Sequence, residues 1–595
     1  GPLAKFEHPT LKVNSIELSP GMLISSAELA IAAGFPNHSV PGIPVIECAE
    51  FGRTVASYDN NNLENKTNSI DLGKIFHMHQ VDENLDVSLD PNSLCMHTFV
   101  TGSTGSGKSN TVYHILNQIQ KLSAHFLVIE PAKGEYKRAF ADIAKVYGTS
   151  PGKIDLLKIN PFSFNDQTHI LEHLDRLIEV FNACWPMYAA MPAVLKEAVE
   201  KAYKDVGWDL TLSVNHYGRM FPTFSDVERN IKTVIDSSEY NNENKGAYKG
   251  ALLTRLHSMS NGINGLCFVE NELSEKELFD KNVIIDLSRV GSSETKSLFM
   301  GIILIKLLEY RMSSGLSNIH LKHITVLEEA HNLLKATASP TSLESSNIAA
   351  KSVEMLTNSI AEMRTYGEAF MIVDQAPGLL DPAAIRNTNT KIIMRLPDYS
   401  DRELVGKAAN LNEDQINELS RLPKGVASVY QNEWIEPVLC KITHADVCDQ
   451  KFEYKDTLSS DFQNEIATKL SICKKLFNGI NSKEFNEKEL NCLTSYAKVK
   501  IFRYIENNPD EENYLELSPI VSTLFPEFIE LYQSKYETNL DNTDAKMQLI
   551  NSVKEIEKDS YVVSGIVQCI ITDYVFNIMK KPELFTSMIF GKKYV

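Results

Sequence analysis

Four residues near the start of the chain have the types and the spacing needed to bind a phosphate chain. They form the pattern G-x-x-x-x-G-K-S, with Gly102, Gly107, Lys108 and Ser109 at its fixed positions. In such a loop the glycines let backbone N–H groups turn toward a β-phosphate, the lysine reaches the β and γ oxygens, and the serine hydroxyl ligates Mg²⁺. The segment predicts a site for ATP with Mg²⁺. The predicted nucleotide contacts are Gly102, Thr104, Gly105, Ser106, Gly107, Lys108, Ser109 and Asn110.

The residues on either side of this loop fit the strand and the helix that must hold it. Residues 98–100 are β-branched or aromatic, which predicts a strand, and residues 111–120 carry apolar side chains at helical spacing. Strand, loop and helix therefore come in the order that a phosphate-binding loop requires. The order of Gly102, Gly105 and Gly107 does not spell G-x-G-x-x-G, which excludes the dinucleotide-binding fingerprint.

Two further segments could supply what a phosphate loop lacks for hydrolysis. Residues 324–331, ITVLEEAH, are an apolar run that ends in Glu328 and Glu329. Because the chain turns at the end of a strand, we expect Glu328 to face Mg²⁺ and Glu329 to reach the attacking water as the catalytic base. Another apolar run, residues 370–374, ends at Gln375, whose amide could donate to a γ-phosphate and accept from water. The sequence thus predicts an NTP hydrolase in which Gln375 senses the bound nucleotide.

Composition and charge limit the class of protein. The chain has 595 residues, 43% hydrophobic and 23% charged, as in globular proteins of several domains. Its formal net charge of −18 excludes a protein coated with nucleic acid over its whole surface, so any DNA should lie in a local groove or pore. The nine cysteines contain no C-x-x-C pair, which excludes zinc ribbons and thioredoxin-like sites and suggests a reducing cytoplasm.

Two apolar runs are candidates for buried helices. Residues 299–308 are interrupted by Lys306, and residues 561–579 by Asp573. A membrane span needs about 20 predominantly apolar residues, so we expect both runs to be core helices and no membrane association.

The pattern of elements divides the chain into three regions. Residues 1–95 are rich in short β runs, with polar breaks such as 82–84, and predict a small β-barrel-like domain. Residues 96–442 alternate strands and helices, which predicts an α/β core with a parallel sheet and a helical insertion at about 165–280. Residues 443–595 predict a helical domain. The expected strands are 13–18, 43–48 and 70–78 in the first region, and 125–130, 282–287, 322–328, 369–374 and 391–396 in the core, closed by a hairpin over 425–442.

Several short segments occur together in one order. They are TGSTGSGKSNTV (101–112), IEPAKGEY (129–136), INP (159–161), LEEAH (327–331), RTYG (364–367), QAP (375–377) and DP (381–382). Over about residues 40–442 the chain resembles the HerA branch of the HerA/FtsK superfamily of RecA-like pumping ATPases. Two positions depart from the family pattern: Glu328 stands where many relatives have Asp, and Ala132-Lys133 stand where archaeal relatives commonly have a shorter turn containing His.

The resemblance implies a RecA-like P-loop core behind a β-barrel, assembled as a homo-hexameric ring that translocates double-stranded DNA through its pore. Carried onto this sequence, it assigns Lys108 and Ser109 to phosphate and Mg²⁺, and Glu328 to the metal. It also assigns Glu329 as the base, and Gln375 as the sensor.

The resemblance implies two further features. Arg364 matches the family's arginine and would act as a finger that enters the site of the neighbouring subunit, an element typically worth about 10³ to 10⁵ in rate. HerA rings act with a nuclease, and bacterial versions often work in antiviral defence beside a nuclease or a sirtuin-like effector, so such a partner is expected.

Two other functions remain open at this point. A conjugation or secretion ATPase would share the same core but usually needs a membrane anchor or a docking partner. An ATP-dependent ring scaffold that assembles and activates an effector enzyme would fit the acidic charge and the helical region at 443–595.

Overall fold

The computed structural model describes residues 51–56, 69–317, 319–336 and 345–447, most of 461–585, and short pieces elsewhere. The chain forms two compact units, residues 1–50 and 51–595. In the first unit β1 (Leu11–Val13) pairs antiparallel with β2 (Ile16–Leu18), so two short paired strands are present where a single strand over 13–18 was expected. The strand expected over 43–48 lies almost entirely outside the described residues.

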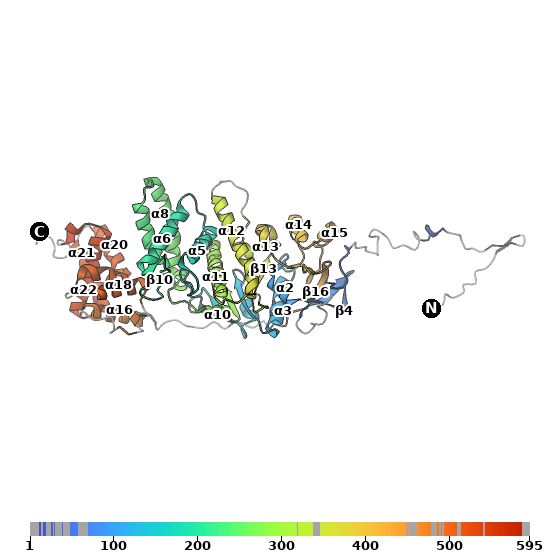
Figure 1. Cartoon of the computed structure of the whole chain (residues 1–595), viewed down its shortest axis with the longest axis horizontal. Coiled ribbons are helices and arrows are strands. Elements are labelled where there is room, and N and C mark those ends of the chain that lie inside the picture. Colours follow the sequence, from blue (N-terminus) through green and yellow to red (C-terminus); the bar gives the residue numbers. More distant parts are fainter. Residues whose placement is uncertain are drawn as a thin grey trace. The chain divides into compact units, whose positions relative to one another are not determined.

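Twelve strands of the second unit form one sheet. In sheet order they are β4 (Gln80–Leu89), β3 (Ile70–His77), β16 (Val438–Ile442), β15 (Val426–Tyr430), β14 (Thr390–Ile393), β5 (Thr98–Thr101), β13 (Glu368–Asp374), β12 (His323–Glu328), β6 (His125–Glu130), β11 (Val283–Asp286), β7 (Lys145–Gly148) and β8 (Asp155–Leu156). Three of them, β13, β16 and β4, are labelled in Figure 1.

The sheet has a parallel part and an antiparallel part. The strands from β14 to β8 are parallel, and β15, β16, β3 and β4 continue the sheet in antiparallel pairs. The predicted α/β fold is confirmed, and each core strand expected from the sequence is present within a few residues. The short strands β7 and β8 were not predicted, because four and two residues are too few to show a pattern.

The boundary expected at residue 95 does not separate two sheets. Strand β3 pairs with β16 at Ile75 and Cys440, and the buried side chains of Ile70 and Leu72 belong to the same apolar core as the parallel strands. The break expected at residues 82–84 is wrong, since β4 runs through it. The chain instead reverses at Met78 and His79, which both have positive φ as a tight hairpin turn requires. Polar residues are tolerated at 82–84 because β4 is an exposed edge strand there.

The insertion between β8 and β11 is mostly helical, as predicted. Its elements are α5 (Ile170–Cys184), α6 (Met191–Asp205), β9 (Trp208–Asp209), β10 (Val214–Asn215), α7 (Phe224–Ser237), α8 (Asn242–Ser260), α9 (Gly262–Cys267) and α10 (Glu275–Phe279). Helix α5 packs against α11 (Ser293–Ser313) and α12 (Ser345–Glu362) of the core. Helix α11 is buried around most of its circumference, as expected for the apolar run at 299–308.

Smaller elements join the core strands. They are α2 (Pro91–Cys95), α3 (Lys108–Lys121), α4 (Tyr136–Ala139), η4 (Met363–Tyr366), α13 (Pro382–Arg386), α14 (Tyr399–Ala408) and α15 (Glu413–Glu418). Helix α3 carries the buried residues Val112, Ile115 and Ile119, which join the apolar core of the sheet. The start of α3 is therefore fixed relative to the strand ends around it.

The region after residue 460 is helical, as predicted. Its helices are α16 (Asp461–Phe477), α18 (Ser495–Glu506), α19 (Tyr514–Leu524), α20 (Pro526–Asn539), α21 (Asn542–Ile556) and α22 (Ser560–Asp573), the last of which continues in a π-helical turn (Tyr574–Ile578). Among the described residues, Ser560–Ile578 is the segment long and apolar enough to cross a membrane. Of its most apolar stretch 67% is buried, and its side chains form the core of this helical region.

Replacing Gly73 by Ala is expected to destabilise the protein. Gly73 has φ of +153°, and an added Cβ would lie 2.1 Å from the backbone oxygen of Lys441, so strands β3 and β16 would have to separate. We expect a loss of about 2 kcal/mol or more in the free energy of unfolding, measured by chemical denaturation. Gly246→Ala is the matched control, because Gly246 lies in exposed helix α8 with open space around it and should gain a little stability. Equal effects of the two changes would contradict the role of Gly73.

Candidate active site

The loop between β5 and α3 has the geometry of a phosphate cradle. Gly102, Gly105 and Gly107 have φ of +154°, +75° and +120°, and an added Cβ at Gly102 would lie 2.7 Å from the Cβ of Met394. These positions therefore need glycine. The loop is held from the neighbouring strands, because Ser103 N–H donates to the carbonyl of Arg395 at 2.8 Å and Gly425 N–H donates to that of Ser106 at 2.9 Å.

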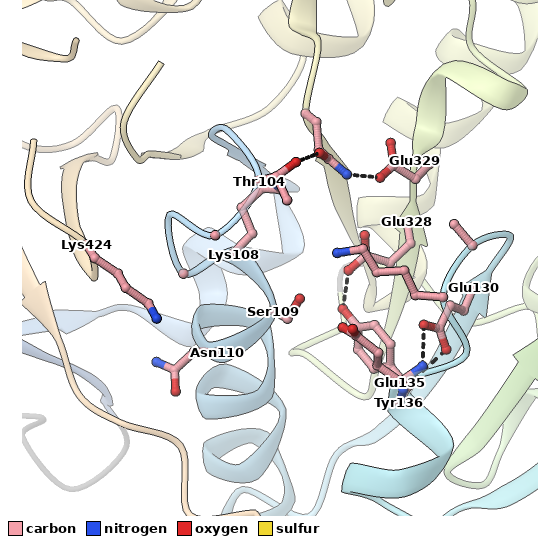
Figure 2. A pocket seen from close by; sticks show the side chains of 15 residues that line it. Thr104, Lys108, Ser109, Asn110, Glu130, Glu135, Tyr136, Glu328, Glu329 and Lys424 are labelled. Carbon is pink, nitrogen blue, oxygen red and sulfur yellow. Dashed lines mark hydrogen bonds between the residues drawn. The ribbon is translucent and has the colours of Figure 1, made fainter. Parts of the chain in front are cut away.

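The loop opens into a pocket of about 330 Å³ (Figure 2). Most of the residues predicted from the sequence line it. These are Thr104, Gly105, Gly107, Lys108, Ser109, Asn110, Glu328, Glu329 and Gln375. Three predicted residues do not line it: Gly102 and Ser106 are part of the loop's own packing, and Arg364 is elsewhere. The buried Ser106 hydroxyl contacts the sulfur of Met394 at 3.8 Å, so this residue can offer a ligand only its backbone.

Lys108 is the first residue of α3 and is largely buried. Its Nζ donates to the carbonyl of Gly102 and lies 3.3 Å from that of Ser103, so the side chain folds back along the loop. Burial lowers the pKa of Lys108, while the nearby Glu328 and Glu329 act in the opposite direction. The lysine is thus held at the loop, beside the unpaired N–H groups of a helix start.

The side chain of Asn110 is engaged in structural contacts. Its amide donates to the carbonyl of Thr443 at 3.1 Å, and its oxygen accepts from Ala445 N–H at 2.9 Å. Asn110 lines the pocket, but both ends of its amide fix the chain that follows β16. The prediction that Asn110 contacts nucleotide stays a prediction, in which its side chain shapes the wall and its backbone can meet the ligand.

Glu328 lies at the carboxyl end of β12 and accepts a hydrogen bond from the hydroxyl of Tyr136. Burial raises the pKa of Glu328 to about 7, an effect that the Tyr136 hydrogen bond partly opposes. Sequence reasoning missed Tyr136. It lies in the IEPAKGEY segment after β6, and only the pairing of β6 with β12 brings the two side chains together.

Glu329 and Gln375 are joined to the phosphate loop by hydrogen bonds. The Gln375 amide nitrogen donates to Glu329, and its oxygen accepts from the Thr104 hydroxyl at 2.6 Å (Figure 2). Glu329 has φ of +46°, a left-handed conformation that is costly for a residue with a side chain and is found where function requires it. The amide thus connects the loop that would hold phosphate to the carboxylate expected to act as the base.

Glu130 is a second residue that the sequence did not single out. It ends β6, lines the pocket, and its carboxylate accepts from the backbone N–H groups of Glu135 at 2.7 Å and Tyr136 at 3.2 Å. Burial raises the pKa of Glu130 to about 8. Through these hydrogen bonds Glu130 holds the turn that carries Lys133. Lys133 also lines the pocket and has φ of +58°.

Arg364 lies at the opposite edge of the sheet. It is exposed, in η4, at the amino end of β13, whereas Gln375 follows the carboxyl end of the same strand. The seven residues of β13 span about 20 Å, so Arg364 is remote from the pocket of its own chain.

Comparison with known proteins finds a family match in the central part of the chain. The family model described as helicase HerA, central domain, matches residues 70–307. This segment of the chain therefore resembles the central domain of HerA, and the chain has the site of a P-loop ATPase. The HerA match starts at the first residue of β3, so strands β3 and β4 lie within the family domain, in agreement with their place in the sheet.

Curated relatives named HerA agree with this match. The chain is similar to the DNA double-strand break repair helicase HerA of Sulfurisphaera tokodaii, 24% identical over 379 residues, with 63% of this chain and 69% of that protein covered. The protein of the same name from Sulfolobus acidocaldarius is 25% identical over 373 residues, 61% of this chain and 68% of that protein. Among solved structures, VirB4 of Thermoanaerobacter pseudethanolicus has a TM-score of 0.50 at 17% identity, with 64% of this chain and 98% of that chain covered. That structural likeness shows a shared fold.

Replacing Glu130 by Gln is expected to change how stability depends on pH. Because the pKa of Glu130 is raised from 4.5 to about 8, the folded protein holds a proton that the unfolded chain has released. This contribution to stability is complete below about pH 4.5 and is lost as the pH rises to about 8. The melting temperature of the nucleotide-free wild type should therefore fall relative to that of Glu130→Gln over this range.

The exposed Glu354 of α12 offers a control for this measurement. Glu354→Gln should keep a constant difference in melting temperature from the wild type. Parallel curves for Glu130→Gln would show that Glu130 is ionised in the folded protein.

Proposed function

We propose that this HerA-type ATPase binds ATP with Mg²⁺ in the pocket, hydrolyses it, and uses the energy to translocate double-stranded DNA. The observation that carries the hydrolytic step is the hydrogen-bonded path from Thr104 through Gln375 to Glu329. It joins the phosphate loop to a carboxylate at the edge of the sheet where parallel strands end. Ligands of open α/β sheets bind at this edge.

The residues around Ser109 and Glu328 fit a magnesium ion. Hydroxyl and carboxylate oxygens are the ligands that Mg²⁺ prefers, and Tyr136 engages only one carboxylate oxygen of Glu328. Mg²⁺, when bound, would neutralise charge on the β and γ oxygens. Lys108 and the N–H groups at the start of α3 would hold the same oxygens from the other side.

Glu329 is placed to take the proton of the attacking water. Gln375 holds its carboxylate through one end of the amide and touches Thr104 of the loop through the other. A γ-phosphate beside Thr104 would therefore change the hydrogen bonds of Gln375 and, through them, the position of Glu329. This arrangement supports Gln375 as the sensor and Glu329 as the catalytic base.

The position of Arg364 supports a ring of identical subunits. Since it lies about 20 Å from its own pocket along β13, it can contribute to hydrolysis only at the site of a neighbour. We propose a homo-hexamer in which Arg364 stabilises the transition state of the adjacent subunit.

The proposed substrate and partners extend the function beyond this chain. The relatives are named as helicases of DNA double-strand break repair, and this supports double-stranded DNA in the central pore. We further propose a nuclease or sirtuin-like effector as a partner protein, in antiviral defence or DNA processing, in the cytoplasm.

A second candidate function is a ring scaffold that activates an effector enzyme. Helices α16 to α22 follow the residues matched by the family and are tied to the insertion by Glu270, which accepts from the Ser495 hydroxyl at 2.8 Å and pairs with Lys498 at 3.0 Å. This attachment would let the helical region present a partner protein while the core binds nucleotide. The two functions differ in whether DNA changes the rate of hydrolysis.

The rate of ATP hydrolysis should rise when linear double-stranded DNA is added, and this stimulation should weaken at higher salt. Glu329→Gln should lower the rate with DNA by about 100-fold or more, because it removes the general base. Glu354→Gln, an exposed change on α12, serves as the control and should behave as the wild type. Hydrolysis that is indifferent to DNA would reject the translocase and favour the scaffold.

Mixing two inactive variants should restore activity if Arg364 acts on a neighbour. Arg364→Ala and Lys108→Ala should each be inactive alone, but a one-to-one mixture of subunits gives complete sites at about a quarter of the interfaces of a ring. The measurement is the ATPase rate of the co-refolded or co-expressed mixture. Lys108→Ala mixed with Glu329→Gln is the control without recovery, because both residues belong to the same subunit's site. Failure of the Arg364 mixture to recover would reject the finger.

A further inference from the structure

Lys424 is a cation in the pocket that neither the motifs nor the proposed mechanism uses. It lies in the loop between α15 and β15, lines the same pocket as Lys108, and has an exposed side chain. Among the described residues its Nζ has no hydrogen-bond or ion-pair partner. Figure 2 shows the side chain reaching toward the start of α3 on the side of Asn110. A cation in this place can attract an anionic ligand.

The backbone that carries Lys424 is fixed to the phosphate loop. The next residue, Gly425, donates its N–H to the carbonyl of Ser106 at 2.9 Å and accepts from Ile442 N–H at 2.9 Å. The carbonyl of Lys424 itself accepts from the Nζ of Lys441 at 2.8 Å. Gly425 has φ of +76°, which turns the chain at this point and favours glycine. The distance from Lys424 to the phosphate cradle is thus set by three hydrogen bonds.

The order of the other groups shows which end of a phosphate chain Lys424 would meet. Glu328, Glu329 and Gln375 mark the γ end, where hydrolysis would occur. Lys133 belongs to that end as well, because it follows β6, which pairs with β12, and Tyr136 of the same segment donates to Glu328. Lys424 lies on the side of Asn110, beyond Ser109 along α3, where the nucleoside end of the phosphate chain must leave the loop.

We propose that Lys424 binds the α-phosphate of the nucleotide. The inference rests on the proposed binding of ATP in this pocket and adds a residue to it. All four carboxylates that line the pocket belong to the γ end or to the turn beside it, namely Glu130, Glu135, Glu328 and Glu329. At the nucleoside end, on the side of Asn110, the described lining of the pocket has one charged residue, Lys424. Its attraction for the α-phosphate is therefore not offset by a neighbouring carboxylate.

This position has a consequence that separates Lys424 from Lys133. ATP and ADP both carry an α-phosphate, so loss of Lys424 should weaken both ligands by the same factor. Lys133 lies near the γ end, so its loss should weaken ATP but not ADP. The two lysines therefore form a matched pair, exposed in the same pocket and different in the phosphate they meet.

The test measures dissociation constants of the full chain for ATP, ADP and inorganic tripolyphosphate by calorimetry. Lys424→Gln should weaken all three by about tenfold, the size of one charge-assisted hydrogen bond, and Lys424→Arg should retain most of the affinity. Lys133→Gln should weaken ATP while ADP stays as in the wild type. Unchanged melting temperatures are expected for both variants, because neither side chain has a described partner in the fold.

Three results would overturn the inference. They are wild-type affinity in Lys424→Gln, a larger loss for ATP than for ADP in that variant, and a loss for ATP with unchanged binding of tripolyphosphate, which would place Lys424 on the nucleoside. Lys108→Ala distinguishes these from failure of the proposed function. If Lys108→Ala binds ATP as tightly as the wild type, the pocket is not the ATP site; if it loses ATP while Lys424→Gln does not, only the assignment of Lys424 fails.

Discussion

The site depends on the alignment of four parallel strands, β5, β13, β12 and β6, at their carboxyl ends. Glu328 pairs with Val373 across β12 and β13, and Asp374 pairs with Thr101 across β13 and β5. This register brings the phosphate loop and the two acidic strand ends to one edge of the sheet. A shift by one residue in any of these pairs would turn the side chains to the other face and separate the carboxylates from the loop.

At this edge of the sheet, burial and hydrogen bonds have opposite effects on the pKa of two carboxyl groups. Burial raises the pKa of Glu328 to about 7 and that of Glu130 to about 8. Hydrogen-bond donors from the segment that follows β6 lower both pKa values in part. Tyr136 supplies a hydroxyl to one and a backbone N–H to the other. One short turn thus opposes the effect of burial at both acids, and Tyr136 contributes to the geometry of the site without a catalytic role of its own.

The parts of this arrangement that are local in sequence could be predicted, and those that depend on distant pairing could not. The loop from Gly102 to Ser109 and the strand-end residues Glu328 and Gln375 each belong to a contiguous apolar run with a polar end, so periodicity and residue type were enough. The bond from Tyr136 to Glu328 depends on β6 lying beside β12. The position of Lys424 depends on a hydrogen bond between Gly425 and Ser106, far apart in the chain. The attachment of β3 to the core sheet likewise depends on its pairing with β16, for which residues 70–78 give no local signal.

The hydrogen bond from Gly425 to Ser106 also connects the phosphate loop to the antiparallel strands of the sheet. Gly425 leads directly into β15, which pairs with β16, and β16 pairs in turn with β3. Asn110 ties the chain after β16 to the start of α3 at a second point. A displacement of the phosphate loop would therefore have to be accommodated by the strands that follow Gly425, and these strands run to the β3–β4 edge of the sheet.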